Sequence, residues 1–341
     1  MLLASHLRLL AASLLLLGLA PAPPPALAPS RPPASLIAYA SKRAGNWDIW
    51  LVDPDGRRET RLTSNAAHER FPVWSPDGRE IMYGSMRGED WDTWQLHVMG
   101  ADGRHATHLA GGIVAKAPRS WSPDGSRIAF EAKRDGNVDI FVVRPDGTGR
   151  TRLTDAPAED GSPRWSPDGS RIAFTSARDG DREVYVMNPD GRRQVRLTRA
   201  SGDDDDPVWS PDGATLAFRS TRDGNRDIWL LRLQDGRASR LTGDSADEFH
   251  PAWSPDGSRI AFQSVREKNH DVEVVEVGSG RRTRLTSGPE FDGQFTWSPD
   301  GTRLAFISGR GGSDALWLIG ADGTGLGRLT SHPSLDPRWG P

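Results

Sequence analysis

From residue 36 to the C-terminus, short apolar runs alternate with turn residues, and no stretch sustains the 3.6-residue period of an amphipathic helix. The runs are rich in Val, Ile, Phe and Trp and are bounded by Gly and Pro, which favours β-strands. Four runs recur in a fixed order: one that ends at a tryptophan, one like "IAF", one like "DIW" and one at "RLT". The pattern predicts a series of four-stranded antiparallel units.

The motif WSPDG marks these units and gives their number. It begins at six tryptophans, at a spacing of 44 residues from Trp121 onward: Trp74, Trp121, Trp165, Trp209, Trp253 and Trp297. A seventh, Trp339, stands in the closing "DPRWGP" without the turn. The second, third and fourth strands each occur seven times, so we expect seven units, with six as the alternative that the motif count alone gives.

The repeated SPDG is interpreted as a hairpin and not as chemistry. Pro presets φ, Asp accepts local backbone hydrogen bonds, and Gly adopts the left-handed conformation that such a turn needs. Because Asp stands beside Gly in every unit, we assign it no catalytic or metal-binding role.

Repeated four-stranded sheets predict an all-β fold, a seven-bladed β-propeller over residues 36–341. The chain enters on the second strand of a unit and ends on a first strand, at Leu335–Trp339. We therefore expect the C-terminal strand to pair with the N-terminal blade and close the ring, which removes the open sheet edges.

The first residues predict export. An apolar run follows Arg8 and is too short to span a bilayer comfortably, so residues 1–28 are interpreted as a signal peptide. Residues 29–35 form a Pro-rich spacer. We expect a periplasmic or secreted protein with no transmembrane segment in the mature chain.

The consensus "WSPDGSRIAFxSxRDGNxDIWxxxPDGxxxxRLT" resembles the PD40 repeat of TolB-type propellers, a WD40-like repeat, over about residues 36–340. It is also similar to the propellers of prolyl-oligopeptidase-like and tricorn-like proteases. The TolB resemblance implies a periplasmic propeller that acts through protein–protein contacts, with the peptidoglycan-associated lipoprotein as partner. TolB has six blades and an additional N-terminal α/β domain, so we expect a stand-alone, TolB-like propeller.

Composition narrows the function further. The net charge is −3 and no basic stripe is present, which argues against nucleic acid. The chain has no cysteine, which excludes disulfides and Cys-type zinc sites. No G-x-S-x-G nucleophile motif is present, so a protease is not expected.

An acid recurs five residues before the tryptophan, where the first strand of a unit begins. These acids are Glu69, Asp160, Asp204, Glu248 and Asp292, with Asp336 nearby in the closing unit. They are interpreted either as an electronegative ring at the mouth of the central channel, which binds a partner, or as groups that bond their own loops. In addition, an Arg precedes an acid by five residues, as in Arg178/Glu183, and we expect the two to clasp a loop.

Aromatic and histidine residues depart from the repeat in loops near these acids. Trp47, Trp91 and Phe249 are either exposed for a protein or glycan partner or folded inward between blades. Three histidines, His68, His250 and His332, lie at different offsets from the tryptophan. A metal site formed by them would resemble that of PD40-containing pectate-fragment lyases.

The sequence thus predicts a non-enzymatic, monomeric scaffold that binds an envelope protein, such as one like the peptidoglycan-associated lipoprotein. No cofactor is predicted, although a divalent cation in the central channel stays open. The alternative is a carbohydrate-active lyase or hydrolase, or a glycan-binding propeller, with a metal site at the channel mouth.

Overall fold

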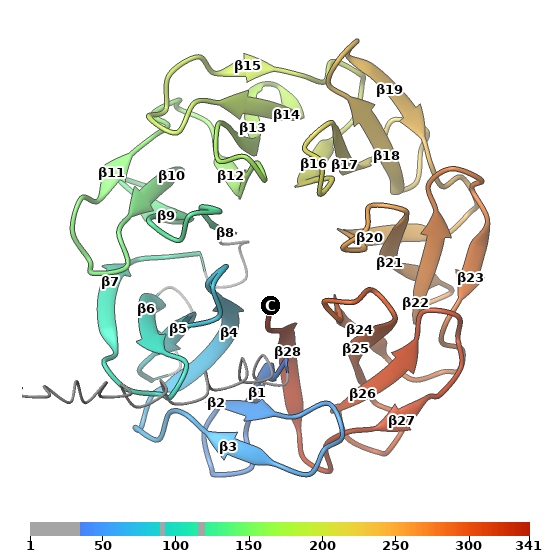
Figure 1. Ribbon diagram of the computed structural model, residues 1–341. Helices are drawn as coiled ribbons and strands as arrows, with labels where there is room; N and C mark the ends of the chain where they lie inside the picture. The colour runs from blue at the N-terminus through green and yellow to red at the C-terminus, as the bar shows by residue number, and fades with distance from the viewer. Residues whose placement is uncertain (1–34, 89–92, 115–119) are drawn as a thin grey trace, which may run out of the picture. The chain divides into compact units, whose positions relative to one another are not determined.

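The computed structural model describes residues 35–88, 93–114 and 120–341. They form seven four-stranded antiparallel sheets around a common centre, with one strand of each sheet innermost (Figure 1). The predicted all-β, seven-bladed propeller is confirmed, and the six-bladed alternative is wrong. The expected signal peptide, and all of the spacer except Ser35, lie outside the described residues. Among the described residues, no helix has the length and apolar character of a membrane span.

Each blade runs from an innermost strand to a short outermost strand. Blade 1 contains β28 (Ser334–Trp339), β1 (Ile37–Ser41), β2 (Asp48–Val52) and β3 (Glu59–Arg61); blade 2 contains β4 (His68–Trp74), β5 (Glu80–Met86), β6 (Gln95–Gly100) and β7 (Thr107–Gly111). Blade 3 contains β8 (Ser120–Trp121), β9 (Ile128–Arg134), β10 (Asn137–Val143) and β11 (Thr151–Arg152); blade 4 contains β12 (Asp160–Trp165), β13 (Ile172–Asp179), β14 (Asp181–Met187) and β15 (Val195–Arg196). Blade 5 contains β16 (Asp204–Trp209), β17 (Thr215–Ser220), β18 (Asp227–Arg232) and β19 (Arg237–Arg240); blade 6 contains β20 (Asp247–Trp253), β21 (Arg259–Arg266), β22 (Asn269–Glu276) and β23 (Arg282–Arg284). Blade 7 contains β24 (Asp292–Trp297), β25 (Arg303–Ser308), β26 (Ala315–Gly320) and β27 (Gly327–Arg328).

The C-terminal strand completes the first blade, as predicted. In the antiparallel pair of β28 and β1, Ile37 lies opposite Trp339. Just beyond the pair, the N–H of Gly340 donates to the carbonyl of Leu36 at 2.8 Å. Both ends of the propeller segment are therefore held in one sheet, and the ring is closed by hydrogen bonds.

The SPDG segments are hairpins, which confirms the interpretation of their aspartates. In blade 2, Asp77 accepts hydrogen bonds from the Ser75 hydroxyl at 2.7 Å and the Arg79 N–H at 3.1 Å, while Gly78 has a φ of 69°. Hydrogen bonds from the preceding serine and from the backbone hold the pKa of all six motif aspartates below its ordinary value. These carboxylates stabilise turns.

The blades pack with a large face against a small one. In the core between blades 3 and 4, Ala129 and Ile140 of blade 3 contact Trp165 and Phe174 of blade 4. The phenylalanines of the "IAF" strands are completely buried throughout: Phe130, Phe174, Phe218, Phe262 and Phe306. Burial of one such ring stabilises the fold by about 1.5–3 kcal/mol, so the contacts between blades contribute strongly to stability.

The motif tryptophans tie each innermost strand to the preceding blade. In five blades the indole N–H donates, at 3.0 to 3.4 Å, to the carbonyl of the residue before the preceding blade's tryptophan; the pairs are Trp74–Arg338, Trp121–Val73, Trp209–Arg164, Trp253–Val208 and Trp297–Ala252. In four interfaces an arginine of the preceding blade also stacks on the indole: Arg127 on Trp165, Arg171 on Trp209, Arg259 on Trp297 and Arg303 on Trp339.

Deleting residues 333–341 removes the innermost strand of blade 1 and leaves β1 as an open edge. We expect a large fall in melting temperature and concentration-dependent aggregation, measured by circular dichroism and size-exclusion chromatography. Trp339→Phe is the matched control, because it keeps the strand and removes one indole hydrogen bond, worth about 1 kcal/mol. A deleted chain that melts like the intact protein would contradict closure by β28.

Candidate functional site

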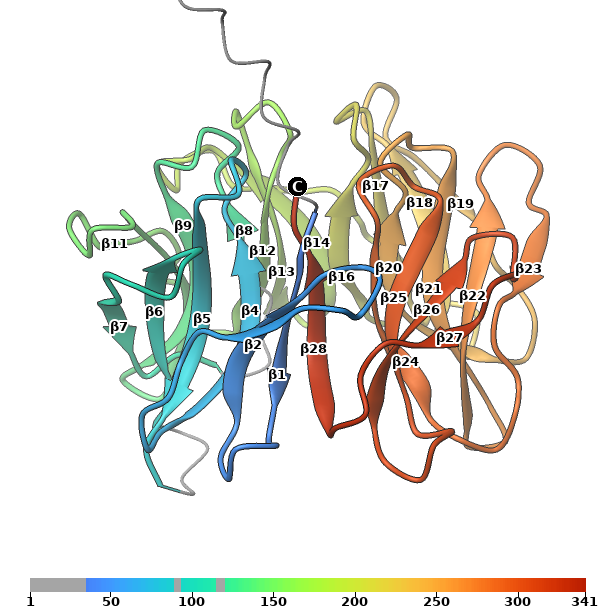
Figure 2. The same cartoon turned by 60° about the horizontal axis from the view of Figure 1, so that its bottom comes forward.

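The two faces of the ring differ in how much they vary between blades. The hairpin face carries the SPDG turns after the innermost strands and the hairpins after the third strands, at the top of Figure 2. The loop face, at the bottom, carries the segments between second and third strands, such as 42–47, and those between blades, such as 62–67. Variable loops on a regular framework are the usual location of a binding site.

The six predicted acids begin the innermost strands near the loop face, but they are buried. The exposed fraction is 0% for Glu69, Asp160, Asp204 and Glu248, 1% for Asp292 and 8% for Asp336. Their burial does not support the interpretation as an exposed electronegative ring, and it fits the alternative in which the acids bond their own loops. The physical reason is that each carboxylate bonds neighbouring side chains beneath the loops instead of facing solvent.

A buried polar cluster holds these acids, and blades 4 and 5 show it in full. The hydroxyl of Thr198 donates to Glu183 at 2.6 Å and accepts the N–H of the third strand at 2.9 Å. Arg196 forms an ion pair with Glu183 of blade 4, and Arg222 pairs at 2.5 Å with Asp204 of blade 5. Each carboxylate thus has its own guanidinium, which offsets the cost of burying the charge.

The same arrangement recurs around the ring. The acid of the third strand pairs with the arginine of "RLT" in Asp48–Arg61, Asp139–Arg152, Asp227–Arg240 and Asp271–Arg284. The acid of the innermost strand pairs with the loop arginine of its own blade in Asp160–Arg178 and Asp292–Arg310. The expected clasp of Arg178 with Glu183 is wrong, because each of them bonds a different partner.

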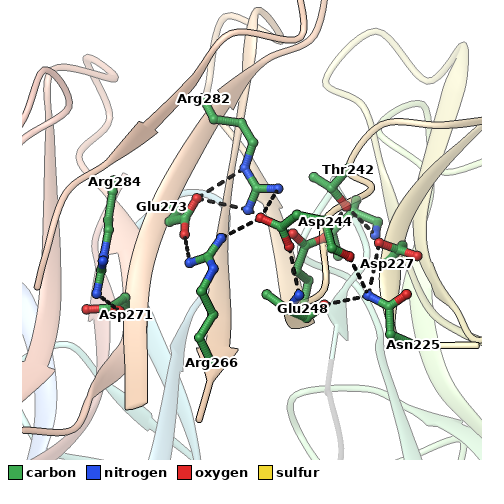
Figure 3. Close-up of polar contacts among 12 residues, drawn as sticks. Asn225, Asp227, Thr242, Asp244, Glu248, Arg266, Asp271, Glu273, Arg282 and Arg284 are labelled. Atoms are coloured by element: carbon green, nitrogen blue, oxygen red, sulfur yellow. Dashed lines mark hydrogen bonds and ion pairs between the residues drawn. The ribbon is translucent and has the colours of Figure 1, made fainter. Parts of the chain in front are cut away.

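Blade 6 departs from this arrangement. On its third strand, Glu273 occupies the position held by aromatic residues in other blades: Trp50, Phe141, Tyr185, Trp229 and Trp317. Glu273 is 3% exposed and bonds both Arg266 and Arg282 (Figure 3). Arg266 also pairs with Asp244 at 2.6 Å, so this loop arginine no longer serves the acid of its own innermost strand.

Glu248 is the carboxylate left without an arginine of its own. It accepts the hydroxyl of Thr242 and lies 2.8 Å from Arg282, which it shares with Asp244 and Glu273 (Figure 3). Burial raises the pKa of Glu248 to about 7, against the opposing effects of the Thr242 hydrogen bond and the Arg282 charge. This buried carboxyl therefore titrates near neutral pH.

An open pocket of about 790 Å³ lies beside this cluster on the loop face. Arg266, Asn269 and Arg284 line it, together with the segment 287–289. At its rim, residues Glu267 and Lys268 form a tight turn with φ values of 50° and 70°, a conformation that non-glycine residues rarely adopt. These two residues are the turn of the hairpin between β21 and β22, where positive φ at both positions matches the twist of the strands.

Sequence reasoning missed Asp244, Glu273 and Arg282. A signal for this cluster was present in the sequence: Glu273 stands at a position that is aromatic in five other blades.

The predicted aromatics lie close to the loop face. Trp47 and Phe249 are half-buried: Arg70 lies over the Trp47 ring at 5.3 Å, and Phe249 lies between Arg219 and Arg226 at 5.3 and 5.5 Å. Each ring is therefore partly packed against the protein and partly exposed to solvent, so neither of the two expected arrangements holds alone. Trp91 lies outside the described residues.

The three histidines do not converge. His68, His250 and His332 belong to blade 2, to blade 6 and to the loop between blades 7 and 1. His68 accepts the N–H of Trp47 at 3.3 Å, and His250 lies 3.6 Å from Asp206. Within the described ranges, no group of three or more His, Cys, Asp or Glu residues is placed to hold a metal ion. The three histidines, weighed only as candidates for a metal site, are therefore not brought together.

Comparison with known proteins gives a consistent picture. A family model described as the TolB beta propeller domain, PD40, matches residues 111–191, 157–249 and 245–341. The chain is 43% identical over 116 residues to a protein TolB homolog of Chlorobium luteolum, which covers 34% of this chain and 26% of that protein. It is 35% identical over 130 residues to the Tol-Pal system protein TolB of Anaeromyxobacter dehalogenans, which covers 37% and 28%. The matches thus span about a quarter of the length of these relatives.

Solved structures share the fold. TolB from Acinetobacter baumannii has a TM-score of 0.57 at 21% identity, covering 90% of this chain and 67% of that one. An oligogalacturonate lyase in complex with manganese has a TM-score of 0.69 at 18% identity, covering 84% and 85%. At these identities the likeness is one of architecture alone.

The titration of Glu248 predicts a pH-dependent stability. The ordinary pKa of Glu is 4.5, and that of Glu248 in the folded protein is about 7. At a pH between these two values, Glu248 is protonated in the folded protein and ionised in the unfolded chain. The contribution of Glu248 to the free energy of unfolding is therefore fully present below pH 4.5 and is lost as the pH rises through 7. Its total size is on the order of 3 kcal/mol. Glu248→Gln should remove this part of the pH dependence of the melting temperature between pH 5 and 8.

Glu159→Gln is the control, because that side chain is 65% exposed and should leave the profile unchanged. A Glu248→Gln variant with the same pH profile as the unmodified protein would rule out the assigned titration.

Proposed function

The chain belongs to the TolB β-propeller family defined by the PD40 repeat, and on this premise we propose that it is a non-enzymatic interaction scaffold of the cell envelope. Its proposed location is the periplasm, where an exported propeller meets envelope proteins. The proposed partner is an envelope protein of the class bound by Tol-Pal components, such as a protein like the peptidoglycan-associated lipoprotein.

The rigid support of the loop face is the observation that carries this proposal. Ion pairs such as Asp160–Arg178 and Asp204–Arg222 fix the ends of loops in successive blades. Preorganised loops lose little conformational entropy when a partner binds, which favours a surface for recognition. The buried acids thus contribute to partner binding by holding the loops, while exposed residues above them make the contacts.

Half-buried aromatics add an anchor to this surface. Phe249 stacks with Arg219 and Arg226, and Trp47 with Arg70, so that rings and guanidinium groups lie together near the loop face. Aromatic and arginine residues contribute most of the binding energy in many protein interfaces. We place the docking surface on the loops of blades 4 to 6, because Phe249 and the polar cluster around Glu248 lie together there.

A lyase function has less support. The three histidines that would supply metal ligands lie in separate parts of the ring, and the lyase likeness is one of fold at 18% identity.

Charge reversal on each face tests the docking surface. Arg182→Glu/Arg226→Glu changes loop-face residues that are 50% and 45% exposed, and Arg57→Glu/Arg192→Glu makes the same change at exposed hairpin-face positions. Immobilised full-length protein is incubated with envelope extract, and the captured proteins are identified by mass spectrometry. We expect the hairpin-face variant to retain an envelope protein and the loop-face variant to lose it at least about tenfold, a change of about 1.4 kcal/mol.

Equal capture by both variants would contradict docking on the loop face. Cleavage of oligogalacturonate by the unmodified protein with manganese would contradict the non-enzymatic assignment itself.

A further inference from the structure

The residue before each motif tryptophan lies on an innermost strand, and in two blades it is an arginine. The uncharged residues at this position are Val73, Ser120, Val208, Ala252 and Thr296. The two arginines are Arg164 on β12 and Arg338 on β28. These strands lie on opposite sides of the ring centre (Figure 1). The repeat therefore places two arginines on innermost strands on opposite sides of the ring.

The backbone of both arginines is fixed. The carbonyl of Arg164 accepts the indole N–H of Trp209 at 3.0 Å, and that of Arg338 accepts the indole N–H of Trp74 at 3.2 Å. Each side chain thus starts from a backbone position that the next blade holds, which preorganises a site.

Both guanidinium groups retain unused hydrogen-bonding capacity. The Nε of Arg164 is buried without a hydrogen-bond partner, and its nearest acid, Asp206, lies 3.9 Å away. Arg338 donates to the adjacent carbonyl of Pro337 at 2.9 Å and forms no ion pair with any residue in the described ranges. By contrast, Arg70 binds Asp336 through two hydrogen bonds, of 2.9 and 3.2 Å.

The surrounding charges leave an excess of positive charge. Asp206 lies 3.6 Å from His250 and 3.9 Å from Arg164, so Arg164 shares this acid with a second side chain. Burial acts to raise the pKa of Asp206, but the His250 hydrogen bond and the Arg164 charge outweigh it and keep the carboxyl ionised. The surrounding protein lowers the pKa of Arg338, the charge of Asp336 opposes this, and the charge of Arg164 lowers it further. Arg338 is exposed and the Arg164 side chain is 32% exposed, so both guanidinium groups are accessible to a ligand, and an anion that binds both offsets their mutual repulsion.

We propose that Arg164 and Arg338 bind a carboxylate ligand at the centre of the ring. A guanidinium presents a planar fork that matches a carboxylate through two parallel hydrogen bonds. Two such forks from opposite walls suit a ligand with two carboxylates, either a small dicarboxylate or a chain segment with neighbouring acidic side chains. This site goes beyond the proposed scaffold function, because it does not depend on the loop-face surface.

Titration calorimetry with the full-length protein tests the site with two probes, succinate and a penta-glutamate peptide, against chloride at equal ionic strength. We expect one or both probes to bind the unmodified protein. Arg164→Gln and Arg338→Gln should each weaken binding about tenfold or more. Arg192→Gln, an exposed hairpin-face arginine, should leave it unchanged.

Each outcome decides the proposal. Succinate binding alone identifies a small-molecule ligand, and peptide binding alone identifies an acidic segment. The proposal is overturned if neither probe binds, or if both single variants bind as the unmodified protein does. If Arg338→Gln disturbs closure of the ring, seen as a lower melting temperature without ligand, Arg164→Gln alone decides, because the ion pair of Arg164 with Asp206 is long, at 3.9 Å.

Discussion

The indole hydrogen bond from one blade to the carbonyl of the preceding blade is the contact on which the ring depends. A single four-stranded sheet is only marginally stable, so each blade needs its neighbours. The large face of one blade could slide along the small face of the next, because apolar packing has no direction. A buried N–H without an acceptor is costly, and in five of the seven pairs of blades this requirement helps to fix the register. Trp339 meets it with the carbonyl of Ser35, which joins the two ends of the propeller segment.

Beneath the loop face, the ring is held by charges instead of apolar contacts. Most of the buried acids there are tolerated because they have an arginine partner and, in most interfaces, a threonine hydroxyl, whereas Glu69 accepts a hydrogen bond from Asn65. A change at one position is therefore felt at another. In blade 6 an acid replaces an aromatic side chain and captures Arg266, and the effect reaches Glu248 on a different strand. A polar layer of this kind makes the interfaces distinct from one another, whereas the apolar layer is almost the same in all seven.

The fold followed from the sequence because its signals are local and repeated. Turn residues, strand periodicity and the broken seventh motif together gave seven blades and closure by β28. The acids were located on the correct strand ends, but their exposure was not predicted. Their partners come from loops in the same blade, as in Asp160 and Arg178, or from the adjacent blade, and neither distance is visible in a linear pattern. Glu273 and Arg338 were overlooked because each obeys the alternation of its strand. They stand out only when one position is compared across all seven units.

The interface between blades 7 and 1 lacks the buried carboxylates found in the other complete clusters. Its third strand has Ala315 and its innermost strand has Ser334, which shares a 3.0 Å hydrogen bond with Thr330. The place where the chain ends meet is thus held by hydroxyl groups and strand pairing, whose strength changes little with acidity or ionic strength. Burial raises the pKa of cluster acids such as Asp204 and Glu248, so a rise in pH would weaken the ring at its internal boundaries first. The two ends of the propeller segment would stay joined while a gap opened elsewhere.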